Sequence, residues 1–116
     1  MIGRAIHNHT DSWDHHEIFH DEGNGVTEES LEYVESLKGK LGKVVDISID
    51  KDREFAMEIK GRNYILLLSG LNCGYGGTGP HGTLKLLKDL GVRVAKSYIT
   101  DNEHCYIDCR RRSIEI

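Results

Sequence analysis

The pattern of apolar and polar residues along the chain predicts two helices. After the turn at 23–25, apolar residues recur every three or four positions from Val26 or Thr27 to about Leu41, which is the period of an amphipathic helix. Thr27 is the expected N-cap, because a threonine side chain can accept a hydrogen bond from a main-chain N–H group of the first turn. Leucines at helical spacing over 83–91 predict a second helix.

Alternating apolar and polar residues predict strands between and after these helices. Three of them follow one another with short turns, at 43–50, 53–59 and 64–69, which predicts an antiparallel meander. In the first of these strands we expect Val45, Ile47 and Ile49 to face the core. Further strands are expected at 92–99 and 104–109, with a short one at 1–6.

Together these elements predict a small α+β fold. We expect an antiparallel or mixed sheet of about five or six strands, with two helices packed on one face. A chain of 116 residues has the length of one domain, so residues 1–116 should form a single domain. Within it, 1–25 is a histidine-rich N-terminal segment and 70–82 is a glycine-rich loop.

The glycine-rich loop is the most distinctive stretch of the sequence. Six of the 13 glycines and the only proline lie within 70–82, between a predicted strand and a predicted helix. Glycine lets main-chain N–H groups approach a ligand closely, and the following helix points the positive end of its dipole the same way. The loop also matches the dinucleotide spacing G-x-G-x-x-G, although no P-loop Gly-Lys-Ser/Thr follows it. The alternative is that the loop only connects two elements.

The loop therefore predicts a site for a phosphorylated ligand, such as a nucleotide or an ADP-ribose-type signal. The residues that the loop offers are Asn72, Gly74, Tyr75, Gly76, Gly77, Thr78, Gly79 and His81. Positive charge is expected from Arg62 or from a tail that folds back, Arg110, Arg111 and Arg112. The alternative for this tail is a solvated chain end. Tyr75 or Tyr98 would offer a ring for a base.

The histidine-rich segment suggests a metal site, with zinc as the candidate metal. His16, Glu17 and His20 satisfy H-E-x-x-H, in which a helix places two imidazoles one turn apart and the glutamate activates a metal-bound water. His7, His9 or an acidic residue could supply a third ligand. Charged residues around the motif are unlike a zinc-protease helix, so a structural metal site and a solvated polar loop are the alternatives. Trp13 and Phe19 should pack on the core or on another subunit.

Composition narrows the classes of function. A net charge of −4 argues against a protein that binds free duplex nucleic acid, which needs a basic face. No apolar stretch has the length of a membrane span and no signal-peptide core is visible, so we expect a cytoplasmic protein without membrane contact. Three cysteines, Cys73, Cys105 and Cys109, make a disulfide framework unlikely, and we expect Cys105 and Cys109 to be buried thiols.

The leading hypothesis is a binding protein without enzymatic activity, which captures a phosphorylated ligand as a sensor or a sponge. A chain this small seldom encloses a nucleotide alone, so a homodimer or a higher homo-oligomer is expected. Two alternatives remain at this level. One is a metal-dependent hydrolase that uses the histidine-rich segment, and the other is an acidic protein-interaction module such as an inhibitor or an immunity protein.

Overall fold

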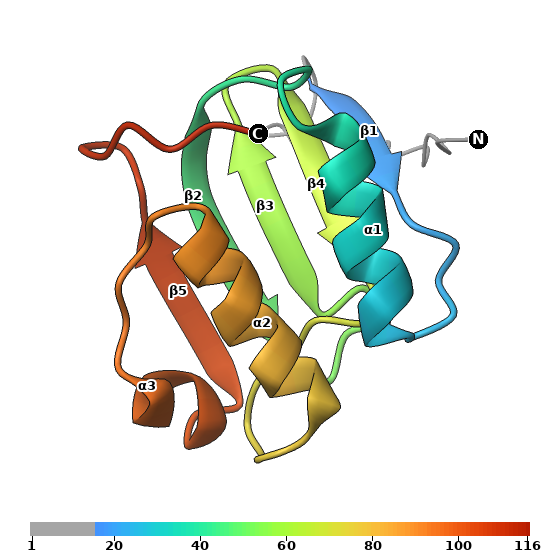
Figure 1. The fold of residues 1–116 in the computed structure, drawn as a ribbon, viewed down its shortest axis with the longest axis vertical. Helices are drawn as coiled ribbons and strands as arrows, with labels where there is room; N and C mark the ends of the chain where they lie inside the picture. Colours follow the sequence, from blue (N-terminus) through green and yellow to red (C-terminus); the bar gives the residue numbers. More distant parts are fainter. Residues whose placement is uncertain (1–15) are drawn as a thin grey trace.

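The computed structural model describes residues 16–116, so the predicted strand at 1–6, His7, His9 and Trp13 lie outside the described residues. The elements of the described chain form a five-stranded mixed sheet with three helices, which confirms the predicted α+β class. They are shown in Figure 1 and follow in the order β1 (Glu17–His20), α1 (Thr27–Leu37), β2 (Val44–Asp50), β3 (Met57–Gly61), β4 (Tyr64–Leu68), α2 (Thr78–Asp89), α3 (Lys96–Thr100) and β5 (His104–Asp108).

The strand order in the sheet is β1-β4-β3-β2-β5. β2, β3 and β4 pair antiparallel in sequence order, so the predicted meander is confirmed. β5 pairs antiparallel with β2, whereas β1 pairs parallel with β4 and makes the sheet mixed. Because β1 and β4 run parallel, they end at the same edge of the sheet, and the chain continues from each toward the start of a helix, α1 or α2.

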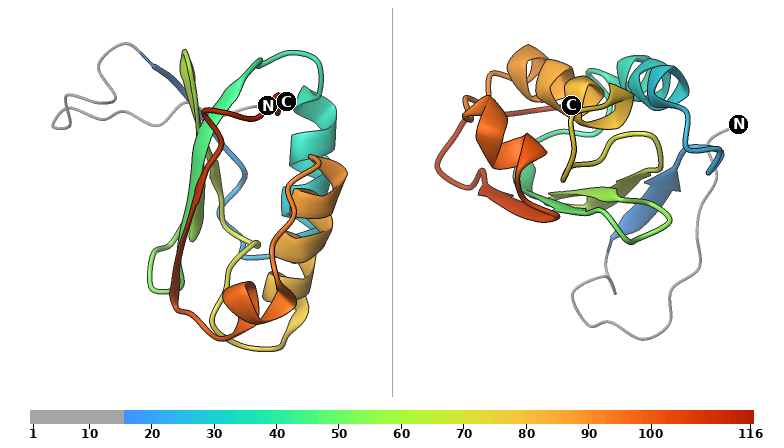
Figure 2. Two further views of the ribbon diagram at one scale, coloured as in Figure 1. Left: turned by 90° about the vertical axis from the view of Figure 1, so that its left-hand side faces the viewer. Right: turned by 90° about the horizontal axis from the view of Figure 1, so that it is seen from below.

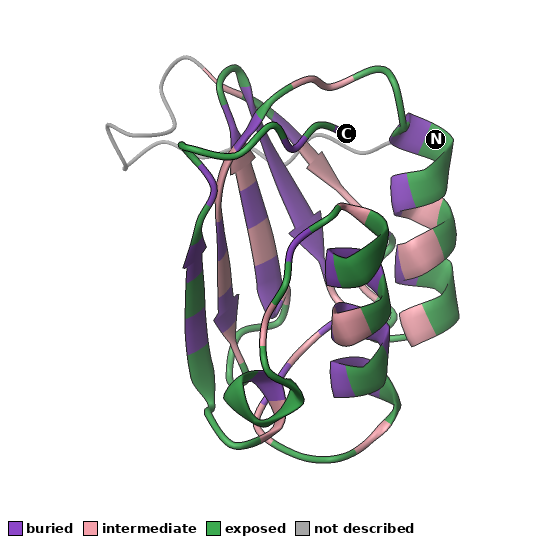
Figure 3. Cartoon of the chain, turned by 60° about the vertical axis from the view of Figure 1, so that its left-hand side comes forward, coloured by how far each residue is buried: buried purple, intermediate pink, exposed green. Residues whose placement is uncertain are grey.

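The helices α1 and α2 pack side by side on one face of the sheet, as predicted (Figure 2). Their buried sides face the strands, and their exposed sides face water (Figure 3). The core between the two layers contains Val34 and Leu37 from α1, Leu86 and Leu87 from α2, and strand residues that include Ile47, Ile59 and Leu66. No helix within residues 16–116 is both long enough and apolar enough to cross a lipid bilayer.

The other face of the sheet carries a smaller apolar cluster. Ile18, Ile65 and Leu67 are buried there, with Phe55 packed against them. Phe19 lies on the opposite side of β1 and packs partly buried against the main core. Of the two packing partners expected for Phe19, the structure therefore shows the chain's own core.

Three predicted details of the first helix and the first meander strand are wrong. Helix α1 ends at Leu37, and its N-cap is Val26, without a capping hydrogen bond from a side chain. The Thr27 hydroxyl donates instead to the carbonyl oxygen of Gly70, 2.7 Å away. In β2 an irregularity between Val44 and Asp46 changes the register, so that Val44 is fully buried and Val45 is only half-buried.

The predicted strand at 92–99 is also wrong. Residues 92–95 form a connection without regular structure, and α3 begins at Lys96. Val92 and Ile99 are buried in the main core, while most residues between them are exposed. The segment carries the chain from the end of α2 to the start of β5, and tertiary packing overrides its strand-like alternation.

Candidate functional site

The glycine-rich loop begins in close contact with α1. The N–H group of Gly70 donates to Ser30 Oγ at 2.8 Å, and its carbonyl oxygen accepts from Thr27. A side chain at Gly70 would overlap the main chain of Val26 and Thr27, so only glycine fits this approach. The start of the loop is therefore fixed to the start of α1.

The middle of the loop is tied to α2 and α3. The Thr83 hydroxyl donates to the carbonyl oxygen of Asn72 at 2.7 Å. The N–H group of Gly74 donates to the carbonyl oxygen of Ile99 at 2.8 Å, and Gly74 adopts a positive φ of 90° that favours glycine. These bonds hold the chain on both sides of the segment that enters α2.

Helix α2 begins five residues earlier than the leucine pattern predicts. Thr78 is its first residue and Gly77 its N-cap, without a capping bond from a side chain. His81 makes the first helical bond, from its N–H group to the carbonyl oxygen of Gly77, and Pro80 has no N–H group. Gly79 and Pro80 therefore belong to the first turn of the helix rather than to the loop.

A run of main-chain donors at this helix start remains unused. Within residues 16–116, no hydrogen bond accounts for the N–H groups of Gly76, Gly77, Thr78 and Gly79. The first N–H groups of any helix lack an intrahelical acceptor, and the helix dipole adds a partial positive charge at the same place. These four donors therefore have the chemistry that binds phosphate oxygens.

Side chains of the loop itself take up part of the space in which a ligand was expected to bind. A Cβ atom on Gly79 would overlap the Asn72 carboxamide, and one on Gly77 would overlap the Tyr75 ring. These two glycines are thus required by neighbouring side chains of the chain itself. Gly76 differs, because a Cβ atom there would meet nothing within 4 Å. A ligand would reach the unused donors from the open side at Gly76 and Thr78.

Lys51 brings a positive charge to the loop, which the sequence did not predict. It lies in the turn after β2, with Nζ 5.7 Å from the centroid of the Tyr75 ring and 3.6 Å from Glu103 Oε2. A Cβ atom on Gly74 would lie 3.1 Å from Lys51 Cδ, so the side chain runs along the loop. The pairing of β2 with β5 places this turn beside the loop, and no local sequence signal reports that pairing.

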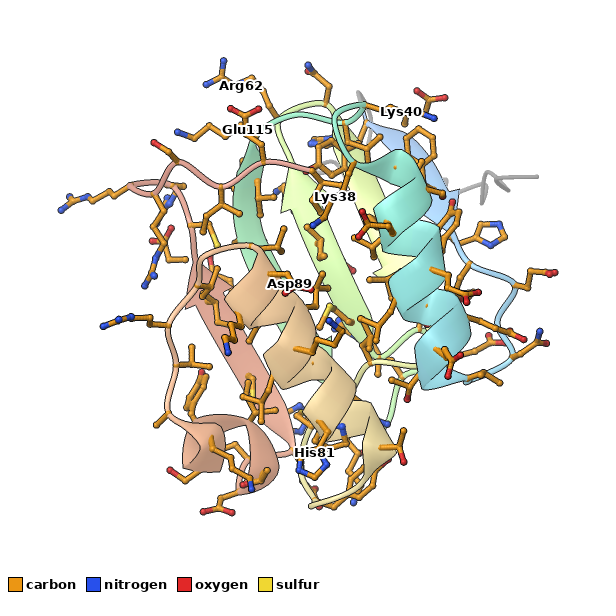
Figure 4. All side chains as sticks on the ribbon, viewed as in Figure 1. Lys38, Lys40, Arg62, His81, Asp89 and Glu115 are labelled. Atoms are coloured by element: carbon orange, nitrogen blue, oxygen red, sulfur yellow. The ribbon has the colours of Figure 1, made fainter. Side chains whose placement is uncertain are left out.

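The arginines that were expected to supply positive charge lie elsewhere. Arg62 and His81 lie at opposite ends of the molecule (Figure 4). Arg110, Arg111 and Arg112 follow the far end of β5, whose five residues span about 13 Å from His104 to Asp108. Arg110 Nη2 lies 2.7 Å from Asp108 Oδ2, and this hydrogen-bonded pairing holds the pKa of the Asp108 carboxyl well below its usual range. The expectation that Arg62 or the arginine tail supplies positive charge to the loop is therefore wrong, because these side chains lie away from it.

Tyr98 was expected to offer a ring for a base. It lies on α3, and its hydroxyl makes hydrogen bonds to the main chain of Tyr106 in β5. His81 is exposed on the first turns of α2, where it lines a groove of about 410 Å³ between the starts of the two long helices. Thr78 and Lys85 line the same groove from α2, and Val26 and Leu31 line it from α1.

The predicted zinc motif lacks the helix that it requires. Glu17–His20 is a strand, in which alternate side chains point to opposite faces, so Glu17 lies opposite His16 and His20. Two residues four positions apart in a strand are about 13 Å apart, too far to bind one ion. His20 Nδ1 lies 2.7 Å from the carbonyl oxygen of Asp21. The hydrolase geometry expected for His16, Glu17 and His20 is therefore absent from this strand.

A different group of metal-ligating side chains occurs at the turn after β2. Ligand atoms of Asp50, Asp52 and His104 lie within 4.8 Å of one another. Contacts within the chain account for this cluster. Asp50 Oδ1 accepts a hydrogen bond from the Asp52 N–H group at 3.0 Å and lies 3.5 Å from His104 Nδ1. Asp52 and His104 are exposed.

The segment of β1 and α1 is acidic. Residues 16–37 contain seven acidic residues and no lysine or arginine, and six of the seven are exposed, whereas Asp21 is buried. Beside α1 lies a hollow of about 460 Å³, lined by His20, Asp21, Glu22, Glu29, Glu32, Tyr33 and Ser36. Burial raises the pKa of the Tyr33 hydroxyl well above its usual range, and the Asp21 carboxylate adds to the effect.

Comparison with known proteins assigns neither a family nor a function to this chain. No protein-family model matches the chain, and no curated protein or solved structure matches it either.

Proposed function

We propose that the chain binds a small phosphorylated molecule at the start of α2 and acts as a sensor or a sponge for it. The observation that carries the proposal is the run of four N–H groups from Gly76 to Gly79, for which residues 16–116 supply no acceptor, at the positive end of the helix dipole. Phosphate oxygens are the acceptors that suit such donors. Lys51 beside the loop adds the positive charge that a phosphate needs.

The remainder of the ligand has two surfaces available next to these donors. On one side Tyr75, which is 43% exposed, offers a ring for a base. On the other side the groove between α1 and α2 offers Thr78, His81 and Lys85 together with an apolar wall. A nucleotide has both a flat base and a phosphate, so we propose a nucleotide-like ligand. Three free, buried cysteines suit a reducing compartment, so we place this function in the cytoplasm.

Calorimetry with a defined set of probes tests this proposal. The probes are ATP, ADP, AMP, ADP-ribose and inorganic phosphate, with adenosine as the probe that lacks phosphate. We expect at least one phosphorylated nucleotide to bind and adenosine to bind more weakly. The proposal fails if no phosphorylated probe binds at millimolar concentration.

Matched variants then locate the site. Lys51→Gln removes the charge beside the loop, and we expect it to weaken binding about tenfold. Arg62→Gln removes the same charge at the opposite end of the molecule and should leave affinity unchanged. Gly76→Val fills open space over the unused donors, so it should abolish binding without loss of stability. If Lys51→Gln and Arg62→Gln change the affinity equally, the ligand does not bind beside Lys51.

An acidic protein-interaction module remains a second prediction. The acidic segment of β1 and α1, with the hollow beside α1, is the observation that favours it, because a basic partner would be complementary in charge.

A further inference from the structure

The strand β5 forms one edge of the sheet, and only one of its sides pairs with β2. The Cys109 N–H group donates to the carbonyl oxygen of Val45, and the Lys51 N–H group donates to that of Glu103. Odd-numbered residues of β5 therefore direct their main-chain groups toward β2. By the alternation of an antiparallel ladder, His104, Tyr106 and Asp108 direct theirs away from the sheet.

The hydroxyl of Tyr98 occupies the centre of this outer edge. It donates to the carbonyl oxygen of Tyr106 at 3.1 Å and accepts from the Tyr106 N–H group at 3.0 Å. A neighbouring strand would make the same two bonds. Tyr98 comes from α3, which lies close to the start of β5 (Figure 1). In the described chain, the outward main-chain groups of His104 and Asp108 have no hydrogen-bond partner.

We propose that β5 is a self-pairing edge, through which two copies of this chain join antiparallel when the Tyr98 hydroxyl leaves Tyr106. While the hydroxyl stays in place, it keeps the copies apart. Pairing about Tyr106 would add about six ladder hydrogen bonds and join the two sheets into one. The proposal does not depend on the phosphate site.

The side chains of β5 identify a second copy as the occupant. Antiparallel pairing about Tyr106 sets His104 opposite Asp108 of the second copy, and the symmetry repeats this contact. Tyr106 then lies opposite its own counterpart, and on the other face Cys105 lies opposite Ile107. The first contact pairs an imidazole with a carboxylate, and cross-strand pairs of two aromatics and of two apolar side chains are favourable. The edge is thus complementary to itself, as a twofold interface requires.

Sedimentation equilibrium on the full chain tests this inference with a matched pair of variants. Tyr98→Phe keeps the ring but removes the hydroxyl from the edge. Tyr106→Phe removes a hydroxyl that donates to Asp46 Oδ2 at 3.0 Å on the exposed face, and it leaves the edge unchanged. We expect the average mass of Tyr98→Phe to rise about twofold with concentration, whereas the average masses of the natural chain and of Tyr106→Phe stay constant over the same range.

A double variant shows whether the edge itself makes the dimer. Adding Tyr106→Pro to Tyr98→Phe removes the outward N–H group without touching the bonds to β2, a position where an edge strand tolerates proline. The dimer should then dissociate, with circular dichroism confirming that the fold remains. The inference is overturned if Tyr98→Phe has the same mass as the natural chain at every concentration, or if the proline leaves the dimer intact.

Discussion

The buried thiol of Cys73 shows how a single residue makes stability depend on pH. Cys73 is fully buried in the main core, and burial, with the Cys105 thiol next to it, raises its pKa from 9.0 to about 12. In the unfolded chain the thiol ionises near its ordinary value, whereas in the folded chain it keeps its proton to higher pH. Between these two pKa values the unfolded chain binds fewer protons than the folded chain, so the free energy of unfolding falls as pH rises.

We predict that Cys73→Ala weakens this pH dependence. The substitution lowers stability at pH 7.5, because it leaves a small cavity in the core. From pH 9 upward the natural chain should lose stability more steeply than the variant, by up to about 1.4 kcal/mol per pH unit. Urea denaturation at pH 7.5, 9, 9.5 and 10 measures how the free energy of unfolding of each protein changes with pH. Parallel loss of stability in the two proteins would contradict this account of Cys73.

Residue by residue, the sequence showed where the glycine-rich segment lies but not which side chains surround it. The glycine-rich segment and the helix after it were recognisable from composition and spacing alone. The sequence could not show that Asn72 and Tyr75 pack against Gly79 and Gly77. It also could not show that Lys51, rather than an arginine, lies beside the loop, because strand pairing between distant segments decides which charges meet.

At the scale of elements, a buried carboxylate joins β1, β4 and α1. Asp21 follows β1, and its Oδ1 accepts from the Gly23 N–H group at 2.9 Å. Its Oδ2 accepts from the Ser69 N–H group at 2.9 Å and from the Ser30 hydroxyl at 2.5 Å. Ser30 in turn accepts from Gly70, the first residue of the glycine-rich loop. The parallel strands and the loop therefore share one hydrogen-bond network.

We predict that Asp21→Ala destabilises the fold by about 3 kcal/mol or more, because it leaves several buried donors without an acceptor. Glu22→Ala is the matched control: its side chain is exposed, and its effect should stay within about 0.5 kcal/mol. Urea denaturation at neutral pH measures both. If the two variants unfold at the same midpoint, Asp21 does not hold these elements together.

The elements that the sequence predicted correctly are those whose own residues show a regular pattern of apolar and polar positions. The meander of β2, β3 and β4 has short turns and regular alternation, and both long helices have leucines or valines at helical spacing. The strand β1 has only four residues in a segment rich in histidine and acid, so a motif match suggested a helix there. Residues 92–99 alternate like a strand, but they form no strand: Val92 and Ile99 are buried in the core, and Val94 packs partly buried against it.

At the scale of the whole molecule, the topology places the candidate site at one end. Parallel β1 and β4 end at the same edge of the sheet, and α1 and α2 both start there. Ligands of open sheets with helices commonly bind beyond the carboxyl ends of parallel strands, where helix starts converge. The position of the unused donors agrees with that rule, whereas Arg62 lies at the other end.

The most direct test of the central claim is amide chemical-shift mapping by NMR during titration with the phosphorylated nucleotide that calorimetry ranks first. Backbone amides report the donors themselves, so we expect the largest shifts at Gly76, Gly77, Thr78 and Gly79, and we expect these shifts to saturate together. Inorganic phosphate should move the same amides with weaker affinity. Saturating shifts confined to other parts of the chain, or no shifts at these four amides, would contradict this claim.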